Sequence, residues 1–299
     1  MQHISHYVDS FFERLDSAYS KGEPVGIPTG FTTLDNLTSG LQQSDLVAIA
    51  ARPGMGKTAL CLAFATNAAV RSSKRVAFFS LEIPAERLIQ RLVASIAGIN
   101  LQRLRLGDLN DDEWPIVSKA VHDLMNLPIY IDDSSDIRIN ELFAKVRKLK
   151  QEKQIDMIVI DSIQRLRGDN VEDRTDETTT IPRALKHIAR ELDVPVIVSC
   201  RLPEGQRMGR RYPPILSDLL RSYSLEQDAD VVMFIHRDRD DDYADSPQEP
   251  IESVHVHVAK HRNGSIGAVT LNFASDGAYF VDLGTVHVLR QTGEKDAKH

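Results

Sequence analysis

The 299-residue sequence predicts an α/β fold with a mostly parallel central sheet flanked by helices and with antiparallel strands at the C-terminal end. Apolar runs of strand length alternate with helical patterns from residue 46 onward, which is typical of a parallel sheet covered on both faces. These runs lie at residues 46–51, 76–81, 128–131, 157–160, 194–199 and 231–235. Residues 252–260 and 268–273 instead alternate apolar and polar side chains, which favours antiparallel strands that finish the sheet.

Length and composition limit the class of protein. With 42% hydrophobic residues, the chain can bury the core of one large domain, and no apolar run approaches the roughly 20 residues of a membrane helix. The first residues lack the basic and apolar regions of a secretory signal, so we expect a cytoplasmic protein with no membrane partner. Cys61 and Cys200 have no metal-ligand partners at zinc-like spacing, which favours reduced thiols in or near the core.

The first expected element is an amphipathic helix at residues 1–20. Its apolar residues recur at spacings of three and four and so share one helical face: Ile4, Val8, Phe11, Leu15 and Tyr19. Glycines and prolines in residues 21–30 predict a linker to a main domain at residues 31–283, which is followed by a polar tail at 284–299. The apolar face needs a partner, either the surface of its own domain or a neighbouring subunit.

The stretch after the first strand carries the strongest chemical signal. It reads Arg52-Pro53-Gly54-Met55-Gly56-Lys57-Thr58-Ala59 and runs through a turn into a helix expected at residues 59–70. The two glycines let backbone N–H groups approach phosphate, and the helix N-terminus adds partial positive charge. The pattern predicts a P-loop for ATP, in which Lys57 reaches the β- and γ-phosphates and Thr58 ligates Mg²⁺. The general motif begins with glycine where this chain has Ala51, but strand, turn and helix follow in the required order.

Two carboxylates are expected at the same edge of the sheet as the phosphates. Asp161 directly follows the apolar run 157–160, where an acid would hold Mg²⁺ through water. Glu82 follows the run 76–81 and would there polarise an attacking water as a general base, or else simply begin a helix before Pro84. The residues alone leave the role of Glu82 open.

These segments together resemble the motor domain of the DnaB family of replicative helicases, which has a RecA-like P-loop NTPase fold. The resemblance runs from about residue 26 to residue 280 and includes four more motifs in the order of that family. They are Ser80-Leu81-Glu82-Ile83-Pro84, Asp161-Ser162-Ile163-Gln164, Leu225-Glu226-Gln227-Asp228-Ala229-Asp230 and Lys260-His261-Arg262-Asn263-Gly264. The resemblance implies use of ATP and Mg²⁺, with Glu82 as the catalytic base.

Lys260 and Arg262 would, on their own, be ordinary surface cations on one side of a strand. The resemblance implies that they act in trans and stabilise charge on the γ-phosphate held by the next subunit. It also implies a homohexameric ring in which residues 1–20 form a linker helix that docks on the adjacent subunit. Primase and a helicase loader are further partners that it suggests. The family's separate N-terminal domain, which helps to recruit primase, has no counterpart in this sequence, so we expect a trimmed chain or a motor-only relative.

Contacts with DNA are expected to be local, because the formal net charge of −7 argues against a surface that coats nucleic acid. Two basic loops, at about residues 165–174 and 201–211, are the candidates. In ring helicases such loops line the pore and follow the backbone of single-stranded DNA. The candidate phosphate contacts are Arg165, Arg167, Arg174, Arg207, Arg210 and Arg211.

Three departures from the family pattern fall near the expected DNA channel. The family has a glutamine that senses the γ-phosphate where this chain has Arg201, a longer and permanently charged side chain and hence a candidate altered sensor. Leu220 and Arg221 stand where the family has an arginine–glutamate pair, and Tyr223 replaces a glycine. Arg165 replaces an apolar residue. ATP binding is therefore a safer prediction than unwinding.

The prediction that follows is an ATP-dependent, hexameric replicative helicase motor that hydrolyses ATP to translocate on single-stranded DNA and unwind duplex. A recombinase-like or clock-type ATPase that assembles without unwinding is a second enzyme hypothesis, and the motif at residues 260–264 counts against it. The alternative of a different class is a DnaB-like paralogue that binds ATP or DNA as a regulatory or assembly partner with weakened unwinding. Arg201, Leu220 and Tyr223 keep that alternative open.

Overall fold

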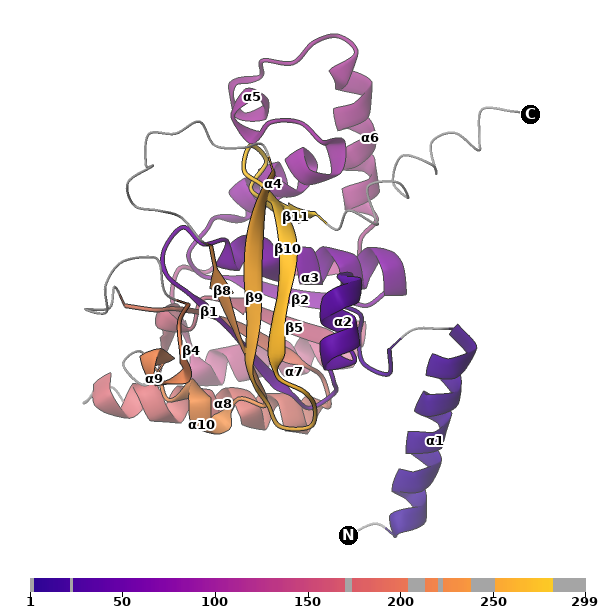
Figure 1. Cartoon of the computed structure of the whole chain (residues 1–299), viewed down its shortest axis with the longest axis vertical. Coiled ribbons are helices and arrows are strands. Elements are labelled where there is room, and N and C mark those ends of the chain that lie inside the picture. Colours follow the sequence, from indigo (N-terminus) through magenta and orange to yellow (C-terminus); the bar gives the residue numbers. More distant parts are fainter. Residues whose placement is uncertain are drawn as a thin grey trace.

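The computed structural model describes residues 3–21, 24–169, 174–203, 213–219, 223–237 and 251–281. Within these ranges a nine-stranded sheet has the order β11-β10-β9-β8-β1-β7-β5-β2-β3 (Figure 1). The parallel strands are β1 (Leu46–Ala51), β2 (Val76–Ser80), β3 (Ile129–Asp132), β5 (Met157–Asp161), β7 (Val196–Arg201) and β8 (Val231–His236). The antiparallel strands are β9 (Ile251–His261), β10 (Gly267–Ala274) and β11 (Tyr279–Val281). The predicted α/β fold is confirmed.

The central strands are buried on both faces, because successive side chains of a strand point to opposite sides of the sheet. In β1, Val47 and Ile49 join the core beneath helices α2 (Thr32–Thr38) and α3 (Lys57–Ser72). Leu46 and Ala48 join the opposite core, beneath helices α7 (Ile139–Lys153) and α8 (Arg174–Leu192). Cys61 and Cys200 form no disulfide and are buried, one in each core, as predicted.

Three helices extend the domain beyond the sheet. They are α4 (Ala85–Ala97), α5 (Leu101–Leu106) and α6 (Glu113–Met125), and they share a small core of their own, which includes Val93, Ile99 and Val117. They lie beyond the end of the β9–β10 hairpin that is nearest to β11 (Figure 1). The pattern of the sequence did not single out these helices.

The N-terminal helix α1 (Ile4–Lys21) stands apart from the sheet (Figure 1). Its large apolar side chains face solvent, with Phe11 55% exposed and Tyr19 88% exposed. Full burial of an exposed apolar side chain of this size contributes roughly 1.5–3 kcal/mol, so covering this face would stabilise the helix. Among the described residues, no helix combines the length and hydropathy that a bilayer-spanning segment requires.

Several element boundaries differ from the predicted ones. Strand β7 begins at Val196 rather than at Val194, because the N–H of Val194 is still bonded to the carbonyl of Ala189 at the end of α8. Strand β2 ends at Ser80, one residue early, and β9 is one residue longer at each end. Short elements were not anticipated: β4 (Ile137–Arg138), β6 (Leu166–Arg167), β11, the 3₁₀ turn η1 (Ile163–Arg165), α9 (Leu216–Leu219) and α10 (Leu225–Asp228).

Candidate nucleotide site

The predicted P-loop joins the C-terminal end of β1 to the first turn of α3. Gly54 and Gly56 have φ angles of 76° and 99°, in the left-handed region that glycine adopts without strain. A side chain at Gly56 would also come within 3.3 Å of Arg237 and of Phe280. Gly54 has open space around it, so a phosphate can approach its backbone. The turn ends at the N-terminus of α3, whose first N–H groups favour an anion. Open space at Gly54 and these N–H groups together make the turn suitable for phosphate.

The side chain of Lys57 points back toward the first residues of the P-loop. Its Nζ donates to the carbonyl oxygens of Ala51, at 3.2 Å, and of Arg52, at 3.3 Å. Burial lowers the pKa of Lys57, and the negative charges of Asp161 and Glu82 oppose that shift. Arg52 and Pro53 are half-buried, while Met55 and Ala59 pack into the core beneath α3. Two carbonyl oxygens thus hold the ammonium beside the turn.

Asp161 ends β5 beside the start of α3. The Thr58 hydroxyl donates to Asp161 Oδ2 at 2.6 Å, and the Ser199 hydroxyl donates to Oδ1. Burial raises the pKa of Asp161, while the bonds from both hydroxyls lower it. A carboxylate and a hydroxyl side by side are ligands of the kind that Mg²⁺ accepts, so these residues fit the predicted metal.

Glu82 lies at the same edge of the sheet. Ser80 of β2 pairs with Asp161 of β5, and the N–H of Leu81 donates to the Asp161 carbonyl at 2.7 Å. Glu82 is exposed, and its Oε1 accepts a 2.7 Å bond from the Ser162 hydroxyl. A carboxylate held at one oxygen and exposed to solvent has a second oxygen to offer to a water molecule.

Arg201 is the last residue of β7 and pairs with Ala51, the first position of the P-loop motif. The amide of Gln164, from η1, accepts from the N–H of Arg201 at 3.2 Å and donates to its carbonyl at 3.1 Å. The Arg201 side chain itself is exposed. Position 201 therefore lies at the edge of the sheet that carries the P-loop, which we call the nucleotide edge. Two hydrogen bonds with Gln164 connect it to the turn that follows Asp161.

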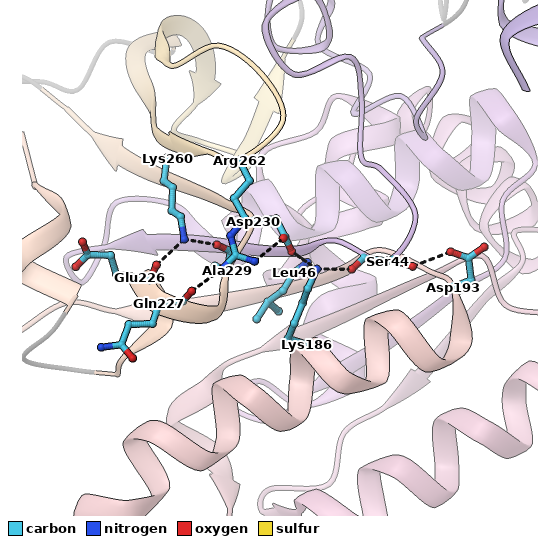
Figure 2. A network of polar contacts seen from close by, with 10 residues as sticks. All are labelled: Ser44, Leu46, Lys186, Asp193, Glu226, Gln227, Ala229, Asp230, Lys260 and Arg262. Atoms are coloured by element: carbon cyan, nitrogen blue, oxygen red, sulfur yellow. Dashed lines mark hydrogen bonds and ion pairs between the residues drawn. The ribbon is translucent and has the colours of Figure 1, made fainter. Parts of the chain in front are cut away.

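Lys260 and Arg262 lie at the opposite edge of the sheet, near the N-terminal end of β1 (Figure 2). Lys260 Nζ donates to the carbonyl oxygens of Glu226, at 2.6 Å, and Ala229, at 2.7 Å. A six-residue strand is about 20 Å long at roughly 3.3 Å per residue, so the structure does not bring this pair to the P-loop of the same chain.

The candidate DNA contacts are placed in part. Arg165 is exposed at the end of η1, whereas Arg167 lies 3.4 Å from Asp136 and donates to the carbonyl of Gln164. Arg174 begins helix α8. Arg207, Arg210 and Arg211 lie outside the described residues, as do Leu220 and Arg221. Tyr223 is described and is buried, with 9% of its surface exposed.

Sequence reasoning missed the groups that hold the site residues in place. The Ser162 hydroxyl holds Glu82 and the Ser199 hydroxyl holds Asp161. Ser162 directly follows β5, where a hydroxyl is an available signal, whereas Ser199 lies inside β7, two residues before its end. Arg91 of α4 was also missed. Its buried Nε has no hydrogen-bond partner in the described part of the chain, and burial lowers its pKa while Asp161 raises it.

Comparison with known proteins identifies relatives of the whole domain. The chain is 42% identical over 285 residues to replicative DNA helicase DnaC of Bacillus subtilis (strain 168), a match covering 94% of this chain and 62% of that protein. It is 44% identical over 275 residues to replicative DNA helicase DnaB of Geobacillus stearothermophilus, with 91% and 60% covered. The chain therefore spans about three fifths of the length of these two relatives.

Solved structures give the same result. The ATPase domain of G40P superimposes with a TM-score of 0.82 and 36% identity, covering 95% of this chain and 99% of that one. A DnaB-like replicative helicase, solved with its interactions with primase, gives a TM-score of 0.78 and 35% identity, covering 95% of this chain and 67% of that one. The model of the DnaB-like helicase C-terminal domain family matches residues 26–282, and the chain belongs to that family.

Proposed function

We propose that this chain is the ATP-hydrolysing motor of a hexameric replicative helicase that translocates on single-stranded DNA and separates duplex. One observation carries the proposal. The P-loop with its two carboxylates lies at one edge of the sheet, and the cation pair Lys260 and Arg262 lies at the other. Each half of a catalytic site therefore needs the complementary half from a neighbouring copy.

At the first edge, the residues divide the work of ATP hydrolysis. Backbone N–H groups of the P-loop and the ammonium of Lys57 hold the β- and γ-phosphates. Thr58 and Asp161 would hold Mg²⁺, which when bound neutralises charge that develops on the phosphate oxygens. Glu82, oriented by Ser162, takes a proton from the attacking water.

At the second edge, Lys260 and Arg262 complete the site of the next subunit. Their positive charges stabilise the transition state, so hydrolysis depends on assembly. The exposed apolar face of α1 supports the same arrangement, because docking on an adjacent subunit would bury Phe11 and Tyr19. Six copies joined in this way would close a ring.

DNA is proposed to pass through the centre of the ring. Arg165, Arg167 and Arg174, which follow Asp161 in the sequence, are proposed to make salt-sensitive contacts with phosphates, together with Arg207, Arg210 and Arg211. One solved relative, a DnaB-like replicative helicase, interacts with primase, and we extend a primase or helicase-loader partnership to this chain as part of the proposal. Its place of action would be the cytoplasm.

A regulatory or assembly role with weakened unwinding is the second candidate. The observation that favours it is Arg201, which occupies the position beside Ala51 where the family pattern has a glutamine. A permanently charged guanidinium does not report the loss of a γ-phosphate as a neutral amide does.

Steady-state ATP hydrolysis, measured with and without single-stranded DNA at concentrations that allow assembly, tests the proposal. We expect hydrolysis that DNA accelerates and that Glu82→Gln reduces by about 100-fold or more. Hydrolysis that ignores DNA would support the regulatory role. No hydrolysis in protein shown to be assembled would contradict the motor proposal altogether.

A further inference from the structure

Asp230 is the buried centre of a polar network at the edge of the sheet that carries Lys260 and Arg262 (Figure 2). Its side chain is 5% exposed, yet every polar atom of the residue has a partner. Its backbone N–H donates to the carbonyl of Leu46 and its carbonyl accepts from the N–H of Arg262, both at 2.9 Å. Its carboxylate accepts from the N–H of Leu46, at 2.8 Å, and from two cationic side chains. Asp230 thus joins the start of β1 to the end of β9.

The two cations reach the carboxylate from different elements. Lys186 of α8 donates to Oδ2 at 2.5 Å and to the carbonyl of Ser44 at 2.7 Å, and its side chain is 20% exposed. Arg262 donates to Oδ1 from Nη1 at 3.1 Å and to the carbonyl of Gln227 from Nη2 at 2.6 Å. The single negative charge of Asp230 is therefore shared between an inner cation, Lys186, and an outer cation, Arg262, whose side chain is 42% exposed.

Lys260 and Arg262, together called the outer cations, each have side-chain N–H groups that make no bond within the described chain and can serve a further partner. Lysine carries three donors and arginine five, and Lys260 and Arg262 each use two within the described chain. The bonds they make fix both side chains against the carbonyl groups of α10. The pair is thus oriented before any neighbouring phosphate arrives, which lowers the cost of ordering it during hydrolysis.

We propose that Lys186 and Asp230 are positioning residues for the trans-acting pair, and that Lys186 keeps Arg262 available by neutralising the inner side of the Asp230 carboxylate. This inference rests on the proposed function. Without Lys186, the whole charge of Asp230 would act on Arg262 and draw the guanidinium inward, away from the adjacent subunit. Without the negative charge of Asp230, Arg262 would lose its charged anchor and keep only neutral acceptors.

A further carboxylate strengthens the need for Lys186. Asp45, 6% exposed, precedes β1, and burial together with the charge of Asp230 raises its pKa to about 6. The charges that act on Asp45 come from Asp230, Lys186 and Arg262, so removing Lys186 leaves Arg262 as the one cation among these groups beside two carboxylates. The resulting excess of negative charge increases the inward pull on that guanidinium.

The test uses Lys186→Met, which keeps the aliphatic stem, with Lys148→Met on the exposed face of α7 as the matched control. We expect kcat for ATP to fall roughly 10- to 100-fold, the size typical of a misplaced catalytic group, with KM for ATP unchanged. Lys186→Arg should restore most of the activity. Thermal unfolding of each variant shows whether the domain is folded.

Mixing subunits separates positioning in trans from damage to the variant's own site. Lys57→Ala subunits have a defective P-loop but intact outer cations, and Lys186→Met subunits have the reverse. We expect their mixture to hydrolyse ATP faster than the sum of the separate proteins, as a mixture of Lys57→Ala with Arg262→Ala also should.

The outcomes separate the inference from the proposed function. If Arg262→Ala fails to complement Lys57→Ala, the trans role of the pair fails, and with it this inference. If Arg262→Ala complements but folded Lys186→Met does not, or if Lys186→Met is as active as the unaltered protein, the positioning role alone is overturned. A folded Lys186→Arg that stays as inactive as Lys186→Met would also contradict it.

Discussion

The two edges of the central sheet are built in different ways. At the nucleotide edge, Lys57 rests on two carbonyl oxygens and Glu82 is held at one oxygen only, so both keep capacity for atoms that come from outside the chain. At the opposite edge, Asp230 has a protein partner for every polar atom, and it binds Arg262 directly. The first edge is arranged to receive a ligand, and the second is arranged to hold a cation in position.

This difference has a consequence for mutations. A change at the nucleotide edge is expected to impair the subunit that carries it, whereas a change at the Asp230 edge is expected to impair the neighbour. The same substitution can therefore leave nucleotide binding intact and still stop hydrolysis. Substitutions at the two edges and between them test that contrast, from the largest expected effect to the smallest.

Arg262→Ala should reduce kcat by about 1000-fold, the lower end of the range for arginines that act across an interface. Affinity for ATP should stay within a factor of about two, because the P-loop of the same chain is unaffected. Phosphate release and equilibrium binding of a fluorescent nucleotide measure the two effects. Arg190→Ala, an exposed position on α8, is the control. A loss of ATP affinity equal to the loss of kcat would place Arg262 in its own subunit's site.

Glu82→Gln should reduce kcat by about 100-fold or more, because the amide cannot accept the proton of the attacking water. ATP should still bind, since Lys57 and Thr58 remain. Glu86→Gln on α4, an exposed glutamate four residues further along, should retain full activity in the same phosphate-release assay. Activity of Glu82→Gln near that of the control would remove Glu82 from the catalytic role.

Glu177→Ala should weaken the response to DNA rather than the chemistry. Glu177 is buried in α8, and its Oε1 accepts the N–H of Gly168 at 2.9 Å, which ties the loop after Asp161 to the helix that carries Lys186. Stimulation of hydrolysis by single-stranded DNA should fall roughly fivefold, a modest coupling energy, while the rate without DNA changes little. Glu152→Ala, exposed on α7, should leave both rates unaltered. Equal losses with and without DNA would argue against coupling through this bond.

Asp45→Asn should stabilise the folded domain at high pH. Because the folded pKa of Asp45, about 6, lies above its ordinary 3.8, the folded state holds the proton more tightly, and stability falls as pH rises from about 4 to about 6. The variant should therefore exceed the unaltered protein by roughly 2–3 kcal/mol in free energy of unfolding at pH 8 and by about half as much at pH 5. Urea unfolding at both pH values measures the gap, and a gap that widens at pH 5 would contradict the sign.

Much of the fold was predictable because it depends on local patterns. Buried strands such as β1 and β5 are uninterrupted apolar runs, and β9 and β10 alternate, so strand type and sheet class follow from the sequence. The strand ends were less predictable, since a hydrogen bond such as that from Val194 to Ala189 decides them. Helices α4 to α6 share a small core of their own, and no sequence motif predicted those helices.

The candidate site also has a part that local sequence patterns predict and a part that only tertiary packing determines. The P-loop is a contiguous motif, and its placement next to Asp161 and Glu82 follows from parallel strands that end at one edge. The partners of Asp230 were not predictable, because Lys186 and Arg262 lie 44 and 32 residues away along the chain. Packing of α8 against the start of β1 brings them together, and no short sequence pattern encodes that contact.

The most direct test of the two-edge account is an experimental structure of the assembled protein with Mg²⁺ and a non-hydrolysable ATP analogue. We expect Lys57, Thr58 and Glu82 of one subunit around the phosphates, with Lys260 and Arg262 of the adjacent subunit facing the γ-phosphate. An assembly in which Arg262 stays beside Asp230 and far from every nucleotide would contradict the account.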